Sequence, residues 1–235
     1  NPNPNPTVPV LPLGFMPAAV IFDMDGLLLD SERVMAACLE ESAVVMGLSV
    51  PRSLWLQMVG KARADCRRML ADHLEDEVCA DALLAASQQR YEARARAGIP
   101  HRPGVGALLA WLASRGMPRA VATTTRQPLA SQKLQAAGLL TYFATVVSST
   151  DVALPKPAPD VYLLAASRLG VAPARCLVLE DSATGVRAAL AAGMTPVQVP
   201  DLVEPDDAVR ALGHRIVASL HEAQALLAAS PGASA

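Results

Sequence analysis

The sequence predicts an α/β fold in which helices cover both faces of a parallel sheet and a helical insertion follows the first strand. Strand-like and helix-like segments alternate from residue 104 onward, whereas residues 32–100 carry helical patterns without a convincing strand. Of the 235 residues, 52% are hydrophobic and 18% charged, which is enough apolar material to bury a core. We therefore expect a parallel-sheet core joined to a smaller helical domain.

Short runs rich in β-branched residues and bounded by turn residues predict the strands of the sheet. These runs cover residues 18–23, 119–123, 145–148, 176–180, 196–199 and 215–217. The helical patterns between them cover residues 105–114, 128–137, 159–169 and 185–192. A glycine follows each of these helices, as is typical of a left-handed C-cap. The alternation favours right-handed βαβ crossovers in one sheet.

The insertion makes the core discontinuous in sequence. Its clearest helical stretches, 33–45 and 76–97, are followed within two residues by a glycine. The predicted division is a core domain (17–31 and 101–235), a helical cap domain (32–100) and an extended proline-rich tail (1–16). Because the prolines of the tail would break a spanning helix, we expect no contact with a membrane.

Composition argues against a nucleic-acid partner. Lysine and arginine total 20 against 22 acidic residues, a net charge of −2, and aromatic residues make up only 3% of the chain. The cysteines form no CxxC pair and lie in apolar stretches, which predicts buried free thiols; they are Cys38, Cys66, Cys79 and Cys176. We expect a cytoplasmic monomer or weak dimer that acts on a small molecule.

The strongest local signal is a pair of carboxylates at the end of the first predicted strand. Asp23 and Asp25 are followed by Gly26, and ligands of parallel α/β sheets bind beyond the carboxyl ends of the strands. Two close carboxylates repel each other unless a cation lies between them, and Mg²⁺ prefers such oxygen ligands. An acidic turn with a helix cap is the alternative interpretation of this motif alone.

Three further segments bring polar groups to the same edge of the sheet. Residues 123–125 are threonines, whose hydroxyl and amide groups either bind phosphate oxygens or cap a helix. Lys156 lies between two prolines, so it is either a fixed cation for phosphate or an ordinary surface lysine. Glu180 and Asp181 end a further strand and could be additional metal ligands.

Taken together and in this order, the motifs FDMDG, TTT, KPAPD and LEDSATG resemble those of the haloacid dehalogenase (HAD) superfamily. The resemblance is to the phosphatases grouped with β-phosphoglucomutase, and it extends from residue 20 to about residue 200. It implies a Rossmann-like, HAD-type core with strand order 5-4-1-2-3, an α-helical cap inserted after the first motif, and Mg²⁺-dependent phosphoryl transfer.

The resemblance also implies roles for the carboxylates. Asp23 corresponds to the nucleophile that forms an aspartyl-phosphate. Asp25 corresponds to the general acid and base, which must be protonated when substrate binds. The implied Mg²⁺ ligands are Asp23, the backbone carbonyl of Asp25, and Asp181, with Glu180 assisting.

Other positions match the substrate-binding parts of the family pattern. Thr123, Lys156 and the amide of Thr124 correspond to groups that neutralise the transferred phosphoryl oxygens. Met24 and Gly26 are expected to contribute to phosphate binding within the first motif. On the cap, Arg63 is expected to contact a distal anionic group, and Arg126 matches a core position that meets the non-transferring part of substrate. For both arginines the alternative is a solvated side chain.

One position departs from the mutase pattern. Met35 stands where β-phosphoglucomutase has a histidine, which disfavours a sugar phosphomutase. We therefore expect a phosphatase acting on a small, sugar-phosphate-like metabolite, with a phosphomutase or a phosphoglycolate phosphatase as alternatives. A phosphorylatable receiver domain is the non-enzyme alternative, but its motif order differs and it needs no helical insertion. Whether Glu32 contacts substrate or only begins the cap is left open.

Overall fold

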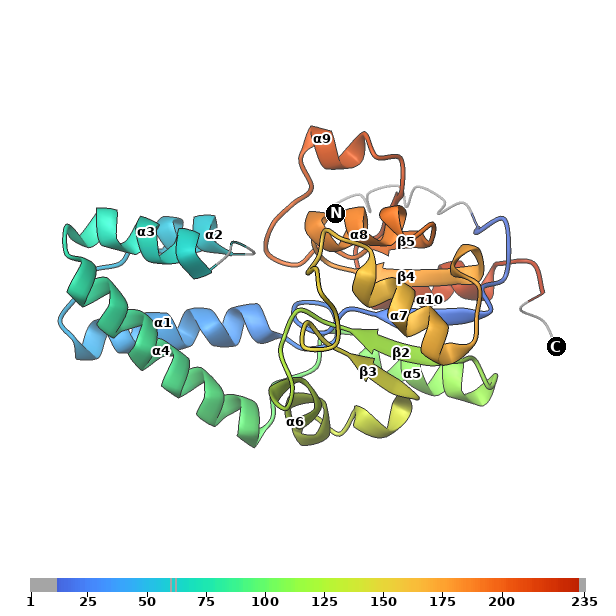
Figure 1. Cartoon of the computed structure of the whole chain (residues 1–235), viewed down its shortest axis with the longest axis horizontal. Coiled ribbons are helices and arrows are strands. Elements are labelled where there is room, and N and C mark those ends of the chain that lie inside the picture. The colour runs from blue at the N-terminus through green and yellow to red at the C-terminus, as the bar shows by residue number, and fades with distance from the viewer. Residues whose placement is uncertain (1–11, 60, 62, 233–235) are drawn as a thin grey trace, which may run out of the picture.

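The computed structural model describes residues 12–59, 61 and 63–232, and its sheet is parallel throughout, in the order β3-β2-β1-β4-β5-β6 (Figure 1). The strands are β1 (Ala19–Phe22), β2 (Arg119–Ala122), β3 (Thr145–Val147), β4 (Cys176–Glu180), β5 (Thr195–Gln198) and β6 (Arg215–Ile216). The order 5-4-1-2-3 predicted from the family resemblance is this order read from the opposite edge, with β6 added beside β5. The predicted fold class is confirmed.

The two central strands are apolar because both of their faces are covered. Every residue of β1 and β4 is buried, which accounts for the nearly continuous apolar runs that predicted them. Phe22 of β1 pairs with Val121 of β2 on one side and with Leu179 of β4 on the other. This register sets the residues that follow β1 between the ends of β2 and β4.

Core helices cover both faces of the sheet. Leu108 of α5 and Leu226 of α10 belong to the apolar cluster on one face, whereas Val161 of α7 and Ala188 of α8 belong to the cluster on the other. The α-helices are α5 (Val105–Ser114), α6 (Leu129–Ala136), α7 (Asp160–Leu169), α8 (Ala183–Ala191), α9 (Asp207–Arg210) and α10 (Leu220–Ala228). Two short 3₁₀ helices, η1 (Leu140–Tyr142) and η2 (Pro173–Arg175), precede β3 and β4.

The segment between β1 and α5 forms a separate helical body, the cap, at one end of the molecule (Figure 1). Its helices are α1 (Ser31–Val45), α2 (Arg52–Met58), α3 (Arg63–Leu74) and α4 (Glu77–Ala97). Leu39, Trp55, Leu70 and Leu83 belong to its own apolar cluster. The sequence pattern delimited α1 and α4 but not α3, because α3 buries only Leu70 and therefore has a weak apolar face. The domain boundaries stay a prediction.

The structure describes the predicted tail only from residue 12 onward, and it bears out part of the cysteine prediction. Residues 1–11 of the predicted tail lie outside the described residues, whereas Leu13 is buried in the core. All four cysteines are free, as predicted, but only Cys38 and Cys176 are fully buried. Among the described residues, none of the helices combines the length and the apolar character needed to cross a membrane.

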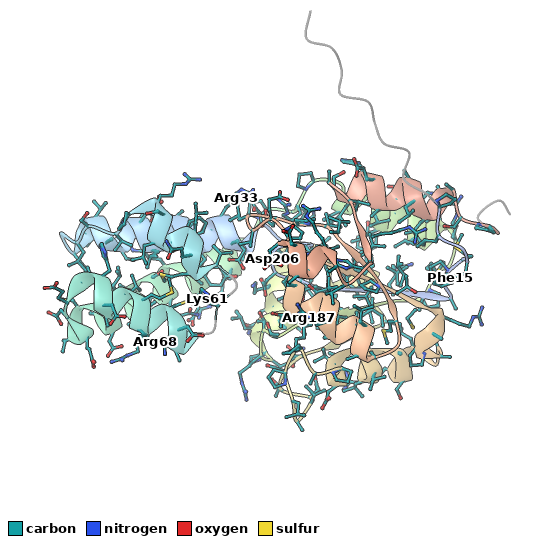
Figure 2. All side chains as sticks on the ribbon, turned by 90° about the horizontal axis from the view of Figure 1, so that it is seen from above. Phe15, Arg33, Lys61, Arg68, Arg187 and Asp206 are labelled. Carbon is teal, nitrogen blue, oxygen red and sulfur yellow. The ribbon has the colours of Figure 1, made fainter. Side chains whose placement is uncertain are left out.

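A buried carboxylate of the core forms ion pairs with one arginine near each end of the cap. Asp201, on the loop after β5, lies 2.8 Å from Arg33 of α1 and 3.0 Å from Arg102 of the returning linker. Arg33 also pairs with Asp30 at 2.8 Å, and Figure 2 shows it at the junction of cap and core. The Asp201 side chain is only 3% exposed and that of Arg102 is 16% exposed, so solvent screens this ion pair weakly.

We expect Asp201→Asn to lower the free energy of unfolding by about 1–3 kcal/mol, because Arg102 loses a buried anionic partner. Urea denaturation followed by circular dichroism measures the change. Glu204→Gln is the matched control, since Glu204 pairs with Arg210 at 3.7 Å while 82% exposed, and should change stability by less than about 0.5 kcal/mol. Equal effects of the two substitutions would contradict the stabilising role of Asp201.

Candidate active site

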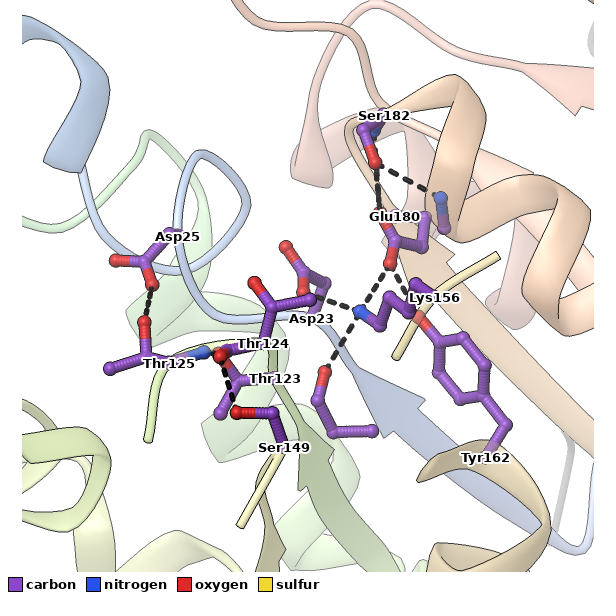
Figure 3. Close-up of polar contacts among 12 residues, drawn as sticks. Asp23, Asp25, Thr123, Thr124, Thr125, Ser149, Lys156, Tyr162, Glu180 and Ser182 are labelled. Carbon is purple, nitrogen blue, oxygen red and sulfur yellow. Dashed lines mark hydrogen bonds and ion pairs between the residues drawn. The ribbon is translucent and has the colours of Figure 1, made fainter. Parts of the chain in front are cut away.

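The polar residues of the predicted motifs lie close together at the ends of neighbouring strands (Figure 3). Asp23 directly follows β1, Thr123 directly follows β2, and Glu180 is the last residue of β4. The backbone N–H of Asp23 donates to the carbonyl of Leu179 at 3.0 Å, which extends the pairing of β1 with β4 by one residue. The parallel register therefore places the Asp23 and Glu180 carboxylates side by side.

Lys156, from the loop between β3 and α7, lies at the centre of this group. Its ammonium donates to Oδ1 of Asp23 at 2.7 Å, to Oε1 of Glu180 at 2.6 Å and to the carbonyl of Ala122 at 3.0 Å, so all three N–H groups are used. Burial alone would lower the pKa of Lys156, but Asp23 and Glu180 together raise it above its ordinary value. The lysine is therefore a fixed, protonated cation rather than a surface side chain.

Glu180 is held from several directions. Its Oε1 also accepts a hydrogen bond from the Tyr162 hydroxyl at 2.5 Å, and its Oε2 accepts one from Oγ of Ser182 at 3.2 Å. Ser182 in turn caps α8 by accepting from the N–H of Gly185 at 3.1 Å. A Cβ at position 185 would lie 1.8 Å from Oε1 of Glu180, so this glycine of the LEDSATG motif lets the helix approach the carboxylate.

Asp23, Glu180 and Asp181 form a cluster that fits a divalent cation. One carboxylate oxygen from each lies within 4.8 Å of the others. Burial and the Glu180 charge raise the pKa of Asp23 from 3.8 to about 7, and burial and the Asp23 charge raise that of Asp181 well above its usual range. Such mutual repulsion is what a hard cation relieves, and oxygen donors suit Mg²⁺.

Asp25 points away from this cluster. Its Oδ1 accepts from Oγ of Ser31 at 2.5 Å and from the Lys133 ammonium, and its Oδ2 accepts from Oγ1 of Thr125 at 2.6 Å. Burial would raise the pKa of Asp25, but the Lys133 charge and these hydrogen bonds lower it overall. These contacts favour the carboxylate form of Asp25, which can accept a proton, in the substrate-free chain. The protonated Asp25 expected when substrate binds stays a prediction.

A cavity of about 480 Å³ lies between the cap and the core. The core side of its lining includes Asp25, Thr124, Thr125 and Lys133. The cap side combines apolar groups with polar and cationic ones; it includes Met35, Trp55, Met58, Leu84, Gln88, Lys61 and Arg63. Figure 2 shows Lys61 on the side of the cap nearest the core. The cavity can thus hold a small molecule in contact with both domains.

Glu32 also lines this cavity, close to the hinge between the domains. Burial, followed by the charges of Asp25 and Asp201, raises the pKa of Glu32 to about 7. A side chain with this pKa can accept or donate a hydrogen bond near neutral pH, which suits contact with a hydroxyl group.

The predicted site residues thus separate into several groups. Asp23, Lys156, Glu180 and Asp181 meet as one cluster. The metal contact implied for the backbone carbonyl of Asp25 stays a prediction. Thr123 is buried, and its Oγ1 accepts from the N–H of Thr125 at 3.1 Å. Figure 3 shows how these threonines follow β2.

Other predicted binding residues are placed less favourably. The Met24 side chain is fully buried in the core, so only its backbone is left for a ligand. The N–H of Gly26 donates to the carbonyl of Leu29 at 2.9 Å, which engages it in the turn. Arg63 lines the cavity, whereas Arg126 is exposed and is not among the lining residues. The binding roles assigned to these residues stay predictions.

The sequence analysis did not single out Lys133 or Tyr91, which contact each other in the structure, because neither belongs to a motif. A signal was present nonetheless: in the predicted helix 128–137, Lys133 occupies the apolar stripe between Ala130 and Leu134. A charged residue on such a face requires a buried partner. Tyr162, which holds Glu180, gave no comparable signal. Ser182 lies within the LEDSATG motif, but the motif alone does not show that it holds Glu180.

The strand-end cluster under a helical cap indicates the class of protein, an enzyme with a parallel-sheet core and an inserted helical cap. A comparison with known families identifies it further: the family model of the haloacid dehalogenase-like hydrolases matches residues 17–193. The chain belongs to this family, in its β-phosphoglucomutase-like group, and is a phosphatase of the HAD type.

Individual relatives agree with this assignment. The plasmid-encoded protein CbbY of Cupriavidus necator is 36% identical over 204 residues, covering 80% of each chain. The fructose-1-phosphate phosphatase YqaB of Escherichia coli is 32% identical over 182 residues, covering 77% of this chain and 96% of the relative. A HAD family hydrolase from Deinococcus radiodurans, solved with phosphate and sodium, matches with a TM-score of 0.77 at 30% identity, covering 92% and 96% of the two chains.

The raised pKa of Asp23 predicts a pH dependence of stability in metal-free protein. The folded chain binds a proton at Asp23 up to about pH 7, whereas the unfolded carboxyl loses it near 3.8. The folded state therefore holds more protons between these values, and this group makes the free energy of unfolding fall, by up to about 4 kcal/mol, as pH rises through them.

Urea denaturation in the presence of a chelator, at several pH values, measures this slope. Asp23→Asn should flatten the slope relative to wild type, because the amide does not titrate. Asp72→Asn, an exposed position on α3, is the control and should retain the wild-type slope. Parallel curves for wild type and Asp23→Asn would show that Asp23 ionises normally.

Proposed function

We propose that the protein hydrolyses the phosphomonoester of a small, sugar-phosphate-like metabolite, with Mg²⁺ as cofactor and an aspartyl-phosphate intermediate on Asp23. The observation that carries this proposal is the Asp23 carboxylate, fixed at 2.7 Å by the Lys156 ammonium within an acidic cluster at the edge of the sheet. Free thiols at all four cysteines are typical of a reducing cytoplasm, where we place the reaction.

In the first half of the proposed reaction, an Asp23 oxygen forms a bond to phosphorus as the bond from phosphorus to the leaving oxygen breaks. Asp23, Asp181, Glu180 and the backbone carbonyl of Asp25 would hold Mg²⁺, which shields the nucleophile from the anionic phosphate when bound. Lys156 keeps the attacking carboxylate oriented, and Thr123 and the Thr124 amide face the phosphoryl oxygens.

Asp25 is the proposed proton donor in the first half of the reaction and the proposed proton acceptor in the second half. It gives a proton to the leaving oxygen in the first half and takes one from the attacking water in the second, when the bond between phosphorus and Asp23 breaks. Its hydrogen bonds to Ser31, Thr125 and Lys133 favour the carboxylate, which is the form that the second half needs. This arrangement supports hydrolysis by water as the outcome.

The cap side of the cavity supports a leaving group that carries polar substituents. Relatives of this chain include a fructose-1-phosphate phosphatase and hexitol phosphatase A, both of Escherichia coli, so phosphorylated sugars and polyols are the first candidates. Gln88 and Glu32 suit hydroxyl groups, and Lys61 and Arg63 suit a second anionic end. Met35, in place of the mutase histidine, supports a phosphatase over a sugar phosphomutase.

Asp23→Asn tests the nucleophile. We expect turnover of phosphorylated sugars and polyols to fall by about 10³-fold or more, roughly 4 kcal/mol of transition-state stabilisation, because the amide is a poor nucleophile. Released phosphate is measured over a panel of substrates, with and without Mg²⁺. The exposed variant Asp72→Asn controls for loss of an aspartate, and near-normal Mg²⁺-dependent turnover by Asp23→Asn would exclude the proposed nucleophile.

Arg63→Ala tests the cap contact. It should lower kcat/KM for sugar bisphosphates by about tenfold, through loss of a charge-assisted hydrogen bond, while p-nitrophenyl phosphate loses less than about twofold. The exposed Arg68→Ala on the same helix is the matched control, because Arg68 pairs with Asp65 rather than lining the cavity. Equal losses on both substrates would count against a role of Arg63 in specificity.

A further inference from the structure

A buried lysine outside the motif cluster joins the core to the cap. Lys133 lies on α6, and its side chain is only 2% exposed. The helix α6 packs beside the C-terminal half of the cap helix α4 (Figure 1). Lysine is almost never buried to this degree without a specific partner, so its surroundings indicate what it does.

Lys133 has one partner in each domain. Its ammonium donates to Oδ1 of Asp25 in the core and to the hydroxyl of Tyr91 on α4 at 2.6 Å. Tyr91 is itself only 6% exposed, and all three residues line the cavity between the domains. The contacts therefore form a continuous path from the cap, through Lys133, to a carboxylate that faces the substrate space.

The donors around Asp25 act unequally on its two oxygens. Ser31 and Lys133 both donate to Oδ1, whereas within the described part of the chain Oδ2 accepts from the Thr125 hydroxyl alone. A hydroxyl can rotate to another acceptor, but the Lys133 ammonium is a charge held between two buried partners. Oδ1 is thus the anchored oxygen of Asp25, and Oδ2 is the oxygen left to exchange a proton.

We propose that Lys133 is a positioning residue that fixes the orientation of the Asp25 carboxyl group toward the leaving oxygen, and that Tyr91 makes this orientation depend on the cap. The proposal rests on the proposed phosphatase reaction. The proton passes from Oδ2 of Asp25 to the leaving oxygen as the bond to phosphorus breaks, and Lys133 keeps its protons throughout. General-acid catalysis depends on the proton donor lying within hydrogen-bonding reach of the acceptor.

A series of substrates that share one ring and differ in the leaving group isolates this role. The probes are p-nitrophenyl phosphate, phenyl phosphate and benzyl phosphate, each assayed with Mg²⁺. Nitrophenolate leaves without a proton, whereas the benzyl alkoxide needs one. Lys133→Met should lower the ratio of kcat/KM for benzyl phosphate to that for p-nitrophenyl phosphate by about tenfold or more.

The ratio is informative even if the variant folds poorly, because both rates come from the same preparation and depend equally on the active fraction. Tyr91→Phe should lower the ratio in the same direction but less, since it removes one acceptor of Lys133 and leaves Asp25 in contact with the ammonium. Lys133→Arg should restore part of the ratio. Gln132→Met, an exposed neighbour on the same helix, should keep the wild-type ratio.

Two outcomes would overturn the positioning role: an unchanged ratio in Lys133→Met, whether or not both rates fall, or an equal loss in Gln132→Met. Failure of the phosphatase proposal itself looks different. In that case wild type shows no Mg²⁺-dependent hydrolysis of any probe, or Asp23→Asn retains it. An active wild type, an inactive Asp23→Asn and an unchanged ratio in Lys133→Met would reject the positioning role alone.

Discussion

The ammonium of Lys156, shared between Asp23 and Glu180, is the interaction on which the site depends. It is the buried cation among three crowded carboxylates, at 2.7 Å from Asp23 and 2.6 Å from Glu180. Without it, the residues that end β1 and β4 would bring uncompensated buried charges together. Because Lys156 also donates to the carbonyl of Ala122, it ties the end of β2 to the same point.

The sheet and this charge cluster constrain each other. The register of β1 against β4 forces two acidic residues to be neighbours, and their repulsion disfavours the fold wherever it is not compensated. A protein selected for stability alone would replace these carboxylates with apolar residues. Their presence in the buried core, together with the raised pKa values of Asp23 and Asp181, is typical of a site where charge is concentrated for chemistry.

The sequence was informative where a polar residue ends a buried strand or directly follows it. Asp23, Thr123 and Glu180 could be predicted to meet, because the carboxyl ends of parallel strands share one edge of the sheet. The partnership of Asp25 with Lys133 and Tyr91 could not, because it depends on how the cap helix α4 packs against α6. Neither pattern nor spacing fixes such packing. The extent of α3 was not foreseen for another reason, because its apolar face is weak.

The position of the two cap linkers affects how new substrate specificities can arise. They lie side by side, with the N–H of Asp30 donating to the carbonyl of Pro100 at 2.8 Å, so the whole cap enters and leaves the core through a single narrow junction. One continuous stretch of gene could therefore be exchanged for another without altering the register of the sheet. Recombination at this junction would place a different cavity lining over the same strand-end cluster.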